Sequence, residues 1–163
     1  MATNIGTGPQ DIPLNQFLGE MAFMDRPPTH PYLEVRLSSS LTTYDGRQLD
    51  NTEIPYNQVD IDTVGGYDPA TGKYTIPERG IYLAVGSIQS SASNYTQVWW
   101  LVNGTRANAS DWVRVGSDDF AQGMSIFYLN PGNTLGFKAY NNTANQTITS
   151  SGNHSYMKIT KIS

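Results

Sequence analysis

The sequence predicts an all-β sandwich of about ten antiparallel strands, and three observations carry that prediction. Short segments of alternating apolar residues recur along the chain, separated by turns rich in Gly, Pro, Asn and Asp. No segment shows the apolar period of a helix. Only 15% of the residues are charged and 38% are hydrophobic, and Asn, Thr, Ser and Gly are abundant among the rest. This composition is typical of a turn-rich two-sheet protein.

The stretch from residue 65 to residue 88 predicts the central strand. Turn residues precede a short strand over 73–76, and the turn over 77–80 then leads into the most apolar segment, 81–88. Alternation along that segment gives two apolar faces: Tyr82, Ala84, Gly86 and Ile88 on one side, and Ile81, Leu83 and Val85 on the other. A strand that is apolar on both faces is covered on both. The second cover is either an edge loop or another subunit.

The remaining strands follow from the same period. They are predicted over residues 32–37, 54–61, 96–102, 108–115, 120–129, 135–140 and 154–162. Asn103-Gly104 is the strongest hairpin signal in the chain. Pro55 makes its strand irregular or an edge strand. Residues 38–43 either extend the first strand or form a loop, and residues 141–152 are predicted to be a polar loop.

We expect a core between the two sheets. Trp99 and Trp100 must face opposite sides of their strand, because neighbouring side chains alternate. The residues expected to be largely buried are Tyr74, Ile76, Tyr82, Trp99, Phe127 and Ile159.

The first 31 residues predict an N-terminal docking arm ahead of the domain formed by residues 32–163. Their glycines and prolines interrupt any long regular element. The segment is nonetheless apolar enough to dock, either on its own domain or on a neighbouring protein. The residues that would dock are Ile12, Leu14, Phe17, Leu18, Met21 and Phe23.

Charge and composition exclude several classes of partner. The net charge of −4 offers no basic patch for nucleic acid. No stretch approaches the ~20 apolar residues of a membrane span, so no membrane insertion is expected. The chain has no cysteine, and residues 1–6 lack the features of a signal peptide. We therefore expect synthesis in a reducing cytoplasm.

The titratable residues do not form an active site in the sequence. His30 lies between prolines in the arm, His154 follows a polar loop, and neither has a partner at a catalytic spacing. There is no phosphate-binding glycine loop and no nucleophile motif. We expect no catalytic residue and no cofactor, and we interpret the chain as a protein that is not an enzyme.

Two pairs of carboxylates are the candidate metal ligands. Asp118 and Asp119 are adjacent, while Asp60 and Asp62 share one face of a strand. Ca²⁺ takes six to eight oxygen ligands, and neither pair has a third ligand in the sequence. We therefore expect no metal site.

Polar and aromatic loop residues could contact a host surface glycan by stacking and hydrogen bonding. The candidates are Asn94, Tyr95, Asn141 and Asn142. The simpler interpretation of the same residues is ordinary turn chemistry.

One set of spaced motifs resembles the C1q/TNF-like globular domain. These motifs are Gly66-Tyr67-Asp68, Thr71-Gly72-Lys73-Tyr74-Thr75, Pro77 and Gly80-Ile81-Tyr82. The resemblance implies a jelly roll over residues 32–163 and a homotrimer. The chain departs from the family in having Ala84 and Gly86 where aromatic residues are usual. The residues it assigns to the core and trimer strand are Tyr74, Gly80, Tyr82, Leu83 and Val85.

Residues 11–25 resemble a segment found in virion proteins of tailed bacteriophages, especially marine and cyanobacterial phages. With the C1q/TNF-like domain, this implies a structural protein of the virion surface, made in the host cytoplasm and bound to other virion proteins. A capsid decoration or cement protein, or a short head fibre, is the leading interpretation. The alternatives are a receptor-binding tip of a tail fibre or spike, and a soluble C1q/TNF-like ligand.

Overall fold

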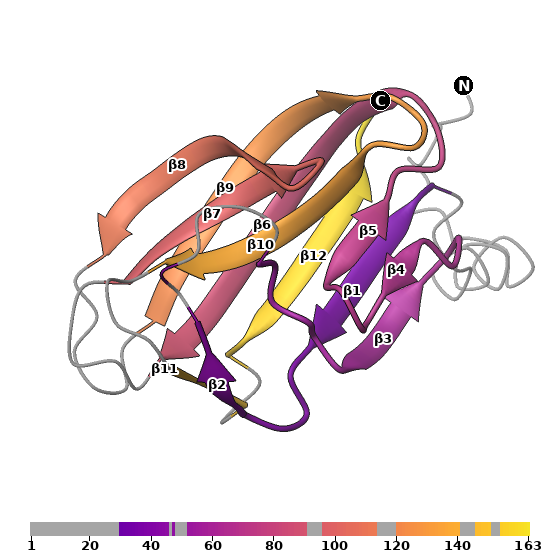
Figure 1. Ribbon diagram of the computed structural model, residues 1–163. Coiled ribbons are helices and arrows are strands. Elements are labelled where there is room, and N and C mark those ends of the chain that lie inside the picture. The colour runs from indigo at the N-terminus through magenta and orange to yellow at the C-terminus, as the bar shows by residue number, and fades with distance from the viewer. Residues whose placement is uncertain are drawn as a thin grey trace, which may run out of the picture.

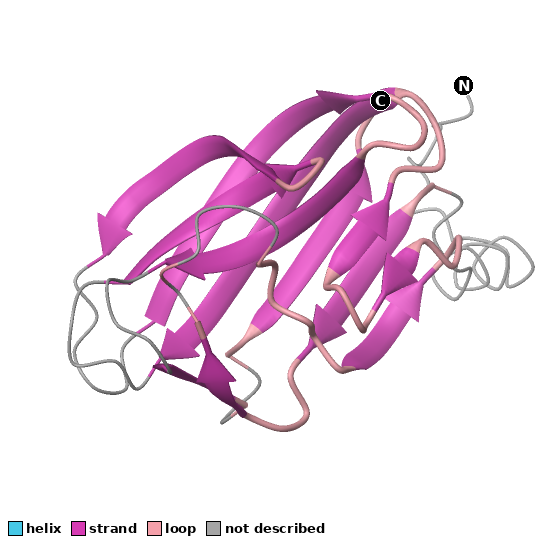
Figure 2. Ribbon diagram, viewed as in Figure 1, coloured by secondary structure: helices cyan, strands magenta, loops and turns pink. Residues whose placement is uncertain are grey.

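The described part of the chain forms twelve antiparallel strands in two sheets, as a computed structural model shows (Figures 1 and 2). The structure describes residues 30–45, 47, 52–90, 96–113, 120–140, 146–150 and 154–163. No helix occurs among these residues, so none of them forms an apolar helix long enough to cross a membrane. The prediction of an all-β sandwich is confirmed.

The first sheet has seven strands and places the two ends of the domain side by side. Its strands are β1 (Tyr32–Arg36), β2 (Leu41–Tyr44), β3 (Gln58–Asp62), β6 (Gly80–Ser90), β9 (Phe120–Leu129), β11 (Gln146–Thr149) and β12 (Tyr156–Lys161). They run in the order β2-β11-β6-β12-β1-β3, and β9 pairs with β6. Among the described strands β3 pairs only with β1, so the predicted edge strand is confirmed.

The second sheet has five strands and lies over the first (Figure 1). Its strands are β4 (Tyr67–Asp68), β5 (Lys73–Thr75), β7 (Thr96–Val102), β8 (Thr105–Val113) and β10 (Thr134–Tyr140), in the order β4-β5-β10-β7-β8. The hairpin between β7 and β8 turns at Asn103 and Gly104, whose φ angles are 53° and 75°. Both values lie in the left-handed region that such a tight turn requires, so the hairpin prediction is confirmed.

β6 is the central strand, as predicted. It pairs with β9 along one edge and with β12 and β11 along the other. Tyr82, Ala84 and Ile88 are completely buried against the opposite sheet. A Cβ added at Gly86 would lie 2.7 Å from the ring of Phe137, so the sheets approach each other too closely there for any side chain.

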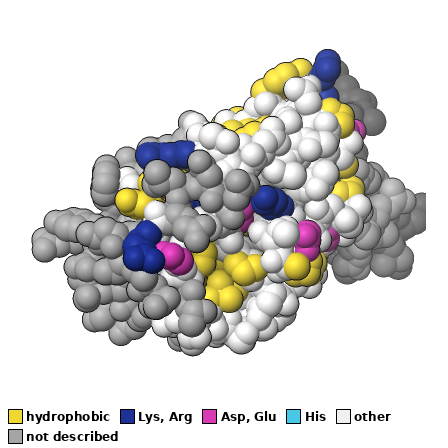
Figure 3. Space-filling view, viewed as in Figure 1, with side chains coloured by type: hydrophobic (Ala, Val, Ile, Leu, Met, Phe, Trp, Pro, Cys, Tyr) yellow, Lys and Arg dark blue, Asp and Glu magenta, His cyan; other side chains and the backbone are white. Residues whose placement is uncertain are grey.

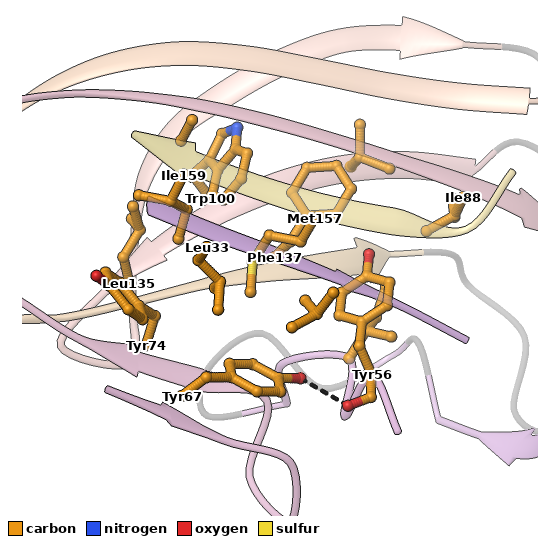
Figure 4. Close-up of a cluster of buried hydrophobic side chains, with 14 of the residues drawn as sticks. Leu33, Tyr56, Tyr67, Tyr74, Ile88, Trp100, Leu135, Phe137, Met157 and Ile159 are labelled. Carbon is orange, nitrogen blue, oxygen red and sulfur yellow. Dashed lines mark hydrogen bonds between the residues drawn. The ribbon is translucent and has the colours of Figure 1, made fainter. Parts of the chain in front are cut away.

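The core lies between the sheets and combines aromatic with aliphatic side chains (Figure 4). The ring of Trp100 lies 4.7 Å from that of Phe137 and 6.2 Å from that of Phe127. All six residues expected to be buried are buried. Trp99, however, faces away from this core. It stacks on Tyr140 at 4.5 Å, and the guanidinium of Arg106 lies 4.1 Å from its ring centre.

Four details differ from the sequence prediction. Residues 141–152 were predicted to be a loop, yet Gln146–Thr149 form β11, which pairs with β2 and β6. Ile148 is its only apolar residue, so period alone does not reveal it. β2 is a strand of its own, and the segment predicted over 54–61 becomes regular only at Gln58. Tyr67–Asp68, expected within a turn, forms the short β4.

Candidate self-association surface

β9 exposes a row of large apolar side chains on the outer face of the seven-stranded sheet. Met124 is 70% exposed, Ile126 62% and Tyr128 65%, while Phe120 at the start of the strand is 41% exposed. The alternate residues of β9 point the other way: Ala121, Phe127 and Leu129 are buried in the core. The strand is therefore apolar on both faces, and only one face is covered.

β6 extends this surface sideways. Ile81, Leu83 and Val85 are half-buried on the same outer face. The strand register places Tyr128 beside Ile81, Ile126 beside Leu83 and Met124 beside Val85. We call the exposed residues of β9 together with these neighbours the β9 strip: Phe120, Met124, Ile126, Tyr128, Ile81, Leu83 and Val85. The strip carries no charge, and exposed apolar patches of this kind mark interaction sites.

A charged hollow lies further along the same sheet face. It has a volume of about 560 Å³ and is lined by Glu34, Arg36, Asp60, Val85, Tyr156 and Lys158. Arg36 Nε lies 2.8 Å from Asp60 Oδ2, and Lys158 Nζ lies 2.7 Å from Glu34 Oε1. Tyr32 donates a hydrogen bond of 2.8 Å to the other oxygen of Glu34. Each of these two ion pairs thus balances its own positive and negative charge within the hollow.

These contacts and burial shift the pKa values of Glu34, Lys158 and Tyr32. The hydrogen bond from Lys158, more than any other contact, holds the pKa of Glu34 below its ordinary value. The same bond raises the pKa of Lys158. Burial is the main reason that the pKa of Tyr32 is raised. The pair is therefore charged at neutral pH.

A second hollow, of about 450 Å³, opens between β2 and the segment that precedes β3. Its lining residues are Ser40, Leu41, Thr42, Tyr44, Asp45, Thr52, Glu53 and Pro55.

The face shown in Figure 3 carries hydrophobic side chains gathered near its lower edge, with acidic and basic side chains beside them.

The polar groups of this second hollow are largely engaged within the chain. The carboxylate of the buried Glu53 lies 3.8 Å from Lys73 Nζ, and the Tyr44 hydroxyl donates to the carbonyl of Thr52. Lys138 donates to the Thr52 hydroxyl, and the Asp45 carboxylate accepts bonds from Arg47. These contacts stabilise the edge of the sandwich.

The structure places the residues predicted for the core and trimer strand in two groups. Tyr74 and Tyr82 are completely buried between the sheets, whereas Leu83 and Val85 belong to the β9 strip. Gly80 begins β6 beside the C-terminus, where an added Cβ would lie 2.4 Å from the Ser163 carbonyl oxygen. Only the second group is accessible to another molecule.

Several candidate residues lie outside the described part of the chain. They are the docking residues Ile12, Leu14, Phe17, Leu18, Met21 and Phe23, the glycan candidates Asn94, Tyr95, Asn141 and Asn142, and the carboxylates Asp118 and Asp119.

Asp62 and His154, two of the described titratable candidates, have structural partners. Asp62 accepts hydrogen bonds from the backbone amides of Val64, Gly65 and Tyr67, which fixes the turn after β3. The His154 ring packs edge-on against Phe120 at 4.4 Å. Within the described ranges, no three His, Cys, Asp or Glu side chains gather as metal ligands would.

Sequence reasoning missed the β9 strip, although the signal for it was present. Residues 120–129 alternate apolar side chains on both faces, just as 81–88 do. Residues 96–102 are also apolar on both faces, but a second cover is predicted only for the β6 segment. Period shows that both faces are apolar, but only the structure shows which face is left uncovered.

Comparisons with known proteins agree with this architecture. A family model described as C1q domain matches residues 38–157. The globular domain of zebrafish complement 1qA is similar in structure, with a TM-score of 0.63 and 11% identity over 82% of this chain and 98% of that one. Murine APRIL has a TM-score of 0.60 and 16% identity over 82% of this chain and 100% of that one. Eiger TNF from S. frugiperda has a TM-score of 0.52 and 14% identity over 85% and 94% of the two chains. A comparison with curated protein sequences gives no match.

Proposed function

Because the chain belongs to the C1q domain family, we propose that it is a non-enzymatic structural protein that assembles into a homotrimer on the surface of a tailed-phage virion. The main observation that supports a homotrimer is the exposed β9 strip. C1q/TNF domain families are non-enzymatic ligand or structural proteins, and three-fold assembly is typical of them. The proposal therefore assigns the strip to contacts between copies of this chain.

Burial of the strip between copies would favour association. Fully burying an aliphatic or aromatic side chain contributes roughly 1.5–3 kcal/mol. Met124, Ile126 and Tyr128 are each more than half exposed in the single chain. Several such side chains from each copy offset the cost of association, which is an estimated 4–15 kcal/mol.

Support for the virion comes from the N-terminal segment. Residues 11–25 resemble segments of tailed-phage virion proteins. The carbonyl of Pro31 accepts a hydrogen bond from the backbone amide of Lys161, so the chain enters the sheet beside its own C-terminal strand. The N-terminal arm is then joined to one end of the domain, which suits an anchor that leaves the rest of the surface free for other contacts.

Light scattering and analytical ultracentrifugation test the assembly. The wild-type protein should have a mass near three times 17.9 kDa. The Ile126→Asp variant should be a folded monomer, because it places a charge in the centre of the apolar strip. Val64→Asp is the matched control, since Val64 is an exposed apolar residue in a turn outside the strip. A monomeric wild-type protein at micromolar concentration would contradict the proposal.

Electron microscopy of purified particles tests the location. A capsid decoration protein would appear as three-lobed density on the head. Density at the tip of a tail fibre would support the receptor-binding alternative instead. Secretion into the medium without any particle density would favour a soluble ligand and contradict the virion role.

A further inference from the structure

The second hollow, between β2 and the segment that precedes β3, contains a buried carboxylate whose hydrogen-bonding capacity is not used. The side chain of Glu53 is only 2% exposed, yet Glu53 Oε1 makes no hydrogen bond within the described part of the chain. Lys73 Nζ lies 3.8 Å from this oxygen, which is beyond hydrogen-bond distance. Lys73 therefore offsets the charge of Glu53 without satisfying Oε1. A buried acceptor in this state needs a donor from outside the chain.

The neighbours of Glu53 in the chain and in the sheet fix its position. The backbone amide of Ile54 donates a hydrogen bond of 2.8 Å to the carbonyl of Phe137, so the segment follows β10 at this point. Pro55 has no amide hydrogen and cannot continue the pairing. Gly136 leaves room for the Glu53 side chain, because a Cβ at Gly136 would collide with Glu53 Cγ. The carboxylate is thus held by packing, as a preorganised binding group is.

The rest of the lining combines hydroxyl groups with apolar surface. Thr42 is exposed on β2, so its hydroxyl is accessible from the hollow. Leu41 and Pro55 are half-buried and give the hollow apolar walls. Among the described strands β2 pairs only with β11, so no described strand covers its other edge. The hollow therefore offers a ligand both polar partners and apolar surface, as small-molecule sites do.

The charges around the second hollow are already balanced, which favours an uncharged ligand. The Asp45 carboxylate accepts hydrogen bonds of 3.1 Å from Nε and from Nη2 of Arg47. Glu53 faces Lys73 in the same way, although at the longer distance given above. A cationic ligand would leave an excess positive charge, and an anionic ligand would face the two carboxylates. A ligand that donates hydrogen bonds without carrying a charge avoids both costs.

We propose that the second hollow binds a carbohydrate, with a hydroxyl group of one sugar ring donating to Glu53. Sugars carry uncharged hydroxyl groups that donate and accept, and their C–H faces pack on apolar surface such as Leu41 and Pro55. The volume of about 450 Å³ lies within the range of about 300–1,000 Å³ that is typical of small-molecule sites. None of the lining residues belongs to the β9 strip or to the charged hollow, so this site is separate from the contacts assigned to assembly.

Saturation-transfer NMR with the full chain tests the proposal. The probes are the methyl glycosides of the common hexoses and N-acetylhexosamines, measured one at a time. At least one of them should receive saturation from the wild-type protein. Glu53→Met removes the carboxylate at similar size and should weaken binding of that probe at least tenfold. Glu78→Met is the matched control, because Glu78 also pairs with a lysine, Lys161, but lies outside the hollow. This control should bind the probe as the wild type does.

A second variant keeps the test decisive if Glu53→Met does not fold. Thr42 occupies an exposed strand position, where an aromatic residue is well tolerated. Thr42→Trp should therefore keep the wild-type circular dichroism spectrum while its ring fills the mouth of the hollow. Binding of the same probe should be lost.

A glycan array distinguishes a single sugar from the terminal sugar of a surface glycan. Binding to immobilised oligosaccharides alone, lost in both variants, assigns the site to the larger ligand. Binding that either folded variant retains, or no binding of the wild type in both assays, overturns the proposal. The proposed homotrimer is tested separately by its mass. A monomeric wild-type protein that binds a glycoside through Glu53 would overturn the assembly and leave this site standing.

Discussion

Two neighbouring tyrosines show how differently a buried hydroxyl can contribute. Tyr67 donates a hydrogen bond of 3.0 Å to the carbonyl of Tyr56, as Figure 4 shows. The hydroxyl of Tyr56 itself is buried without a hydrogen-bond partner among the described residues. Burial also raises the pKa of Tyr56, so this hydroxyl stays protonated. A buried polar group without a partner costs stability, whereas a bonded one contributes.

We therefore expect opposite results from the same substitution at these two positions. Tyr56→Phe should leave the free energy of unfolding unchanged or raise it, because it removes an unbonded hydroxyl. Tyr67→Phe should lower the free energy of unfolding by about 0.5–1.5 kcal/mol, because the hydrogen bond from the Tyr67 hydroxyl to the Tyr56 carbonyl is lost. Urea unfolding of both variants measures the difference. A larger loss at Tyr56 than at Tyr67 would show that the Tyr56 hydroxyl has a partner.

Strands β1, β12 and β3 are joined on their outer face by charges as well as by backbone hydrogen bonds. Glu34 of β1 contacts Lys158 of β12, and Arg36 of β1 contacts Asp60 of β3. The Glu34 carboxylate is partly exposed, so solvent weakens its ion pair, and such pairs typically contribute about 0.2–1 kcal/mol.

The lowered pKa of Glu34 predicts a small loss of stability in acid. Its contribution is complete above the unfolded-state pKa of about 4.3 and disappears as the pH falls through the lower folded-state value. Glu34→Gln removes this contribution, so the wild type should be more stable than the variant at pH 7 and equal to it at the acid end. Urea unfolding from neutral pH into acid, at one protein concentration, gives the comparison. A difference that persists unchanged in acid would contradict the assignment.

At the scale of the whole molecule, both ends of the described chain lie together. Pro31 contacts Lys161 through the backbone, and the backbone amide of Ile81 donates to the carbonyl of Ser163. The N-terminal arm is therefore joined at the end of the domain that also holds the C-terminus. Ile81 belongs to the β9 strip and pairs with Tyr128, so the C-terminus lies beside one end of the strip.

Removal of residues 1–29 should separate anchoring from folding. The carbonyls of His30 and Pro31, which accept bonds from Thr63 and Lys161, remain in this variant. We expect a folded trimer with an unchanged melting temperature that no longer incorporates into phage particles. Quantitative gels of purified particles measure incorporation. The full-length Ile126→Asp variant is the control; it should bind weakly, because a single arm lacks the avidity of three. Normal incorporation of the deletion variant would move the attachment to the sandwich itself.

The sequence by itself determined the features that depend on neighbours along the chain. Period-two alternation identified β6 and placed Tyr82 and Leu83 on opposite faces of the strand. Asn103-Gly104 identified the hairpin, because few residue pairs accept its backbone angles. These signals depend on one or two residues of local geometry, so they need no knowledge of the rest of the fold.

Only the tertiary structure decided which strands meet and which apolar face stays open. Residues 34, 36, 60 and 158 form one hollow because β1 pairs with both β3 and β12, although β12 follows β1 by more than a hundred residues. Trp100 faces the core and Trp99 faces away from it because β7 lies in one particular register. β9 shows its apolar row to solvent because no described element packs over the outer face of its sheet there. Local alternation cannot give these answers, since strand order and burial follow from the packing of the whole chain.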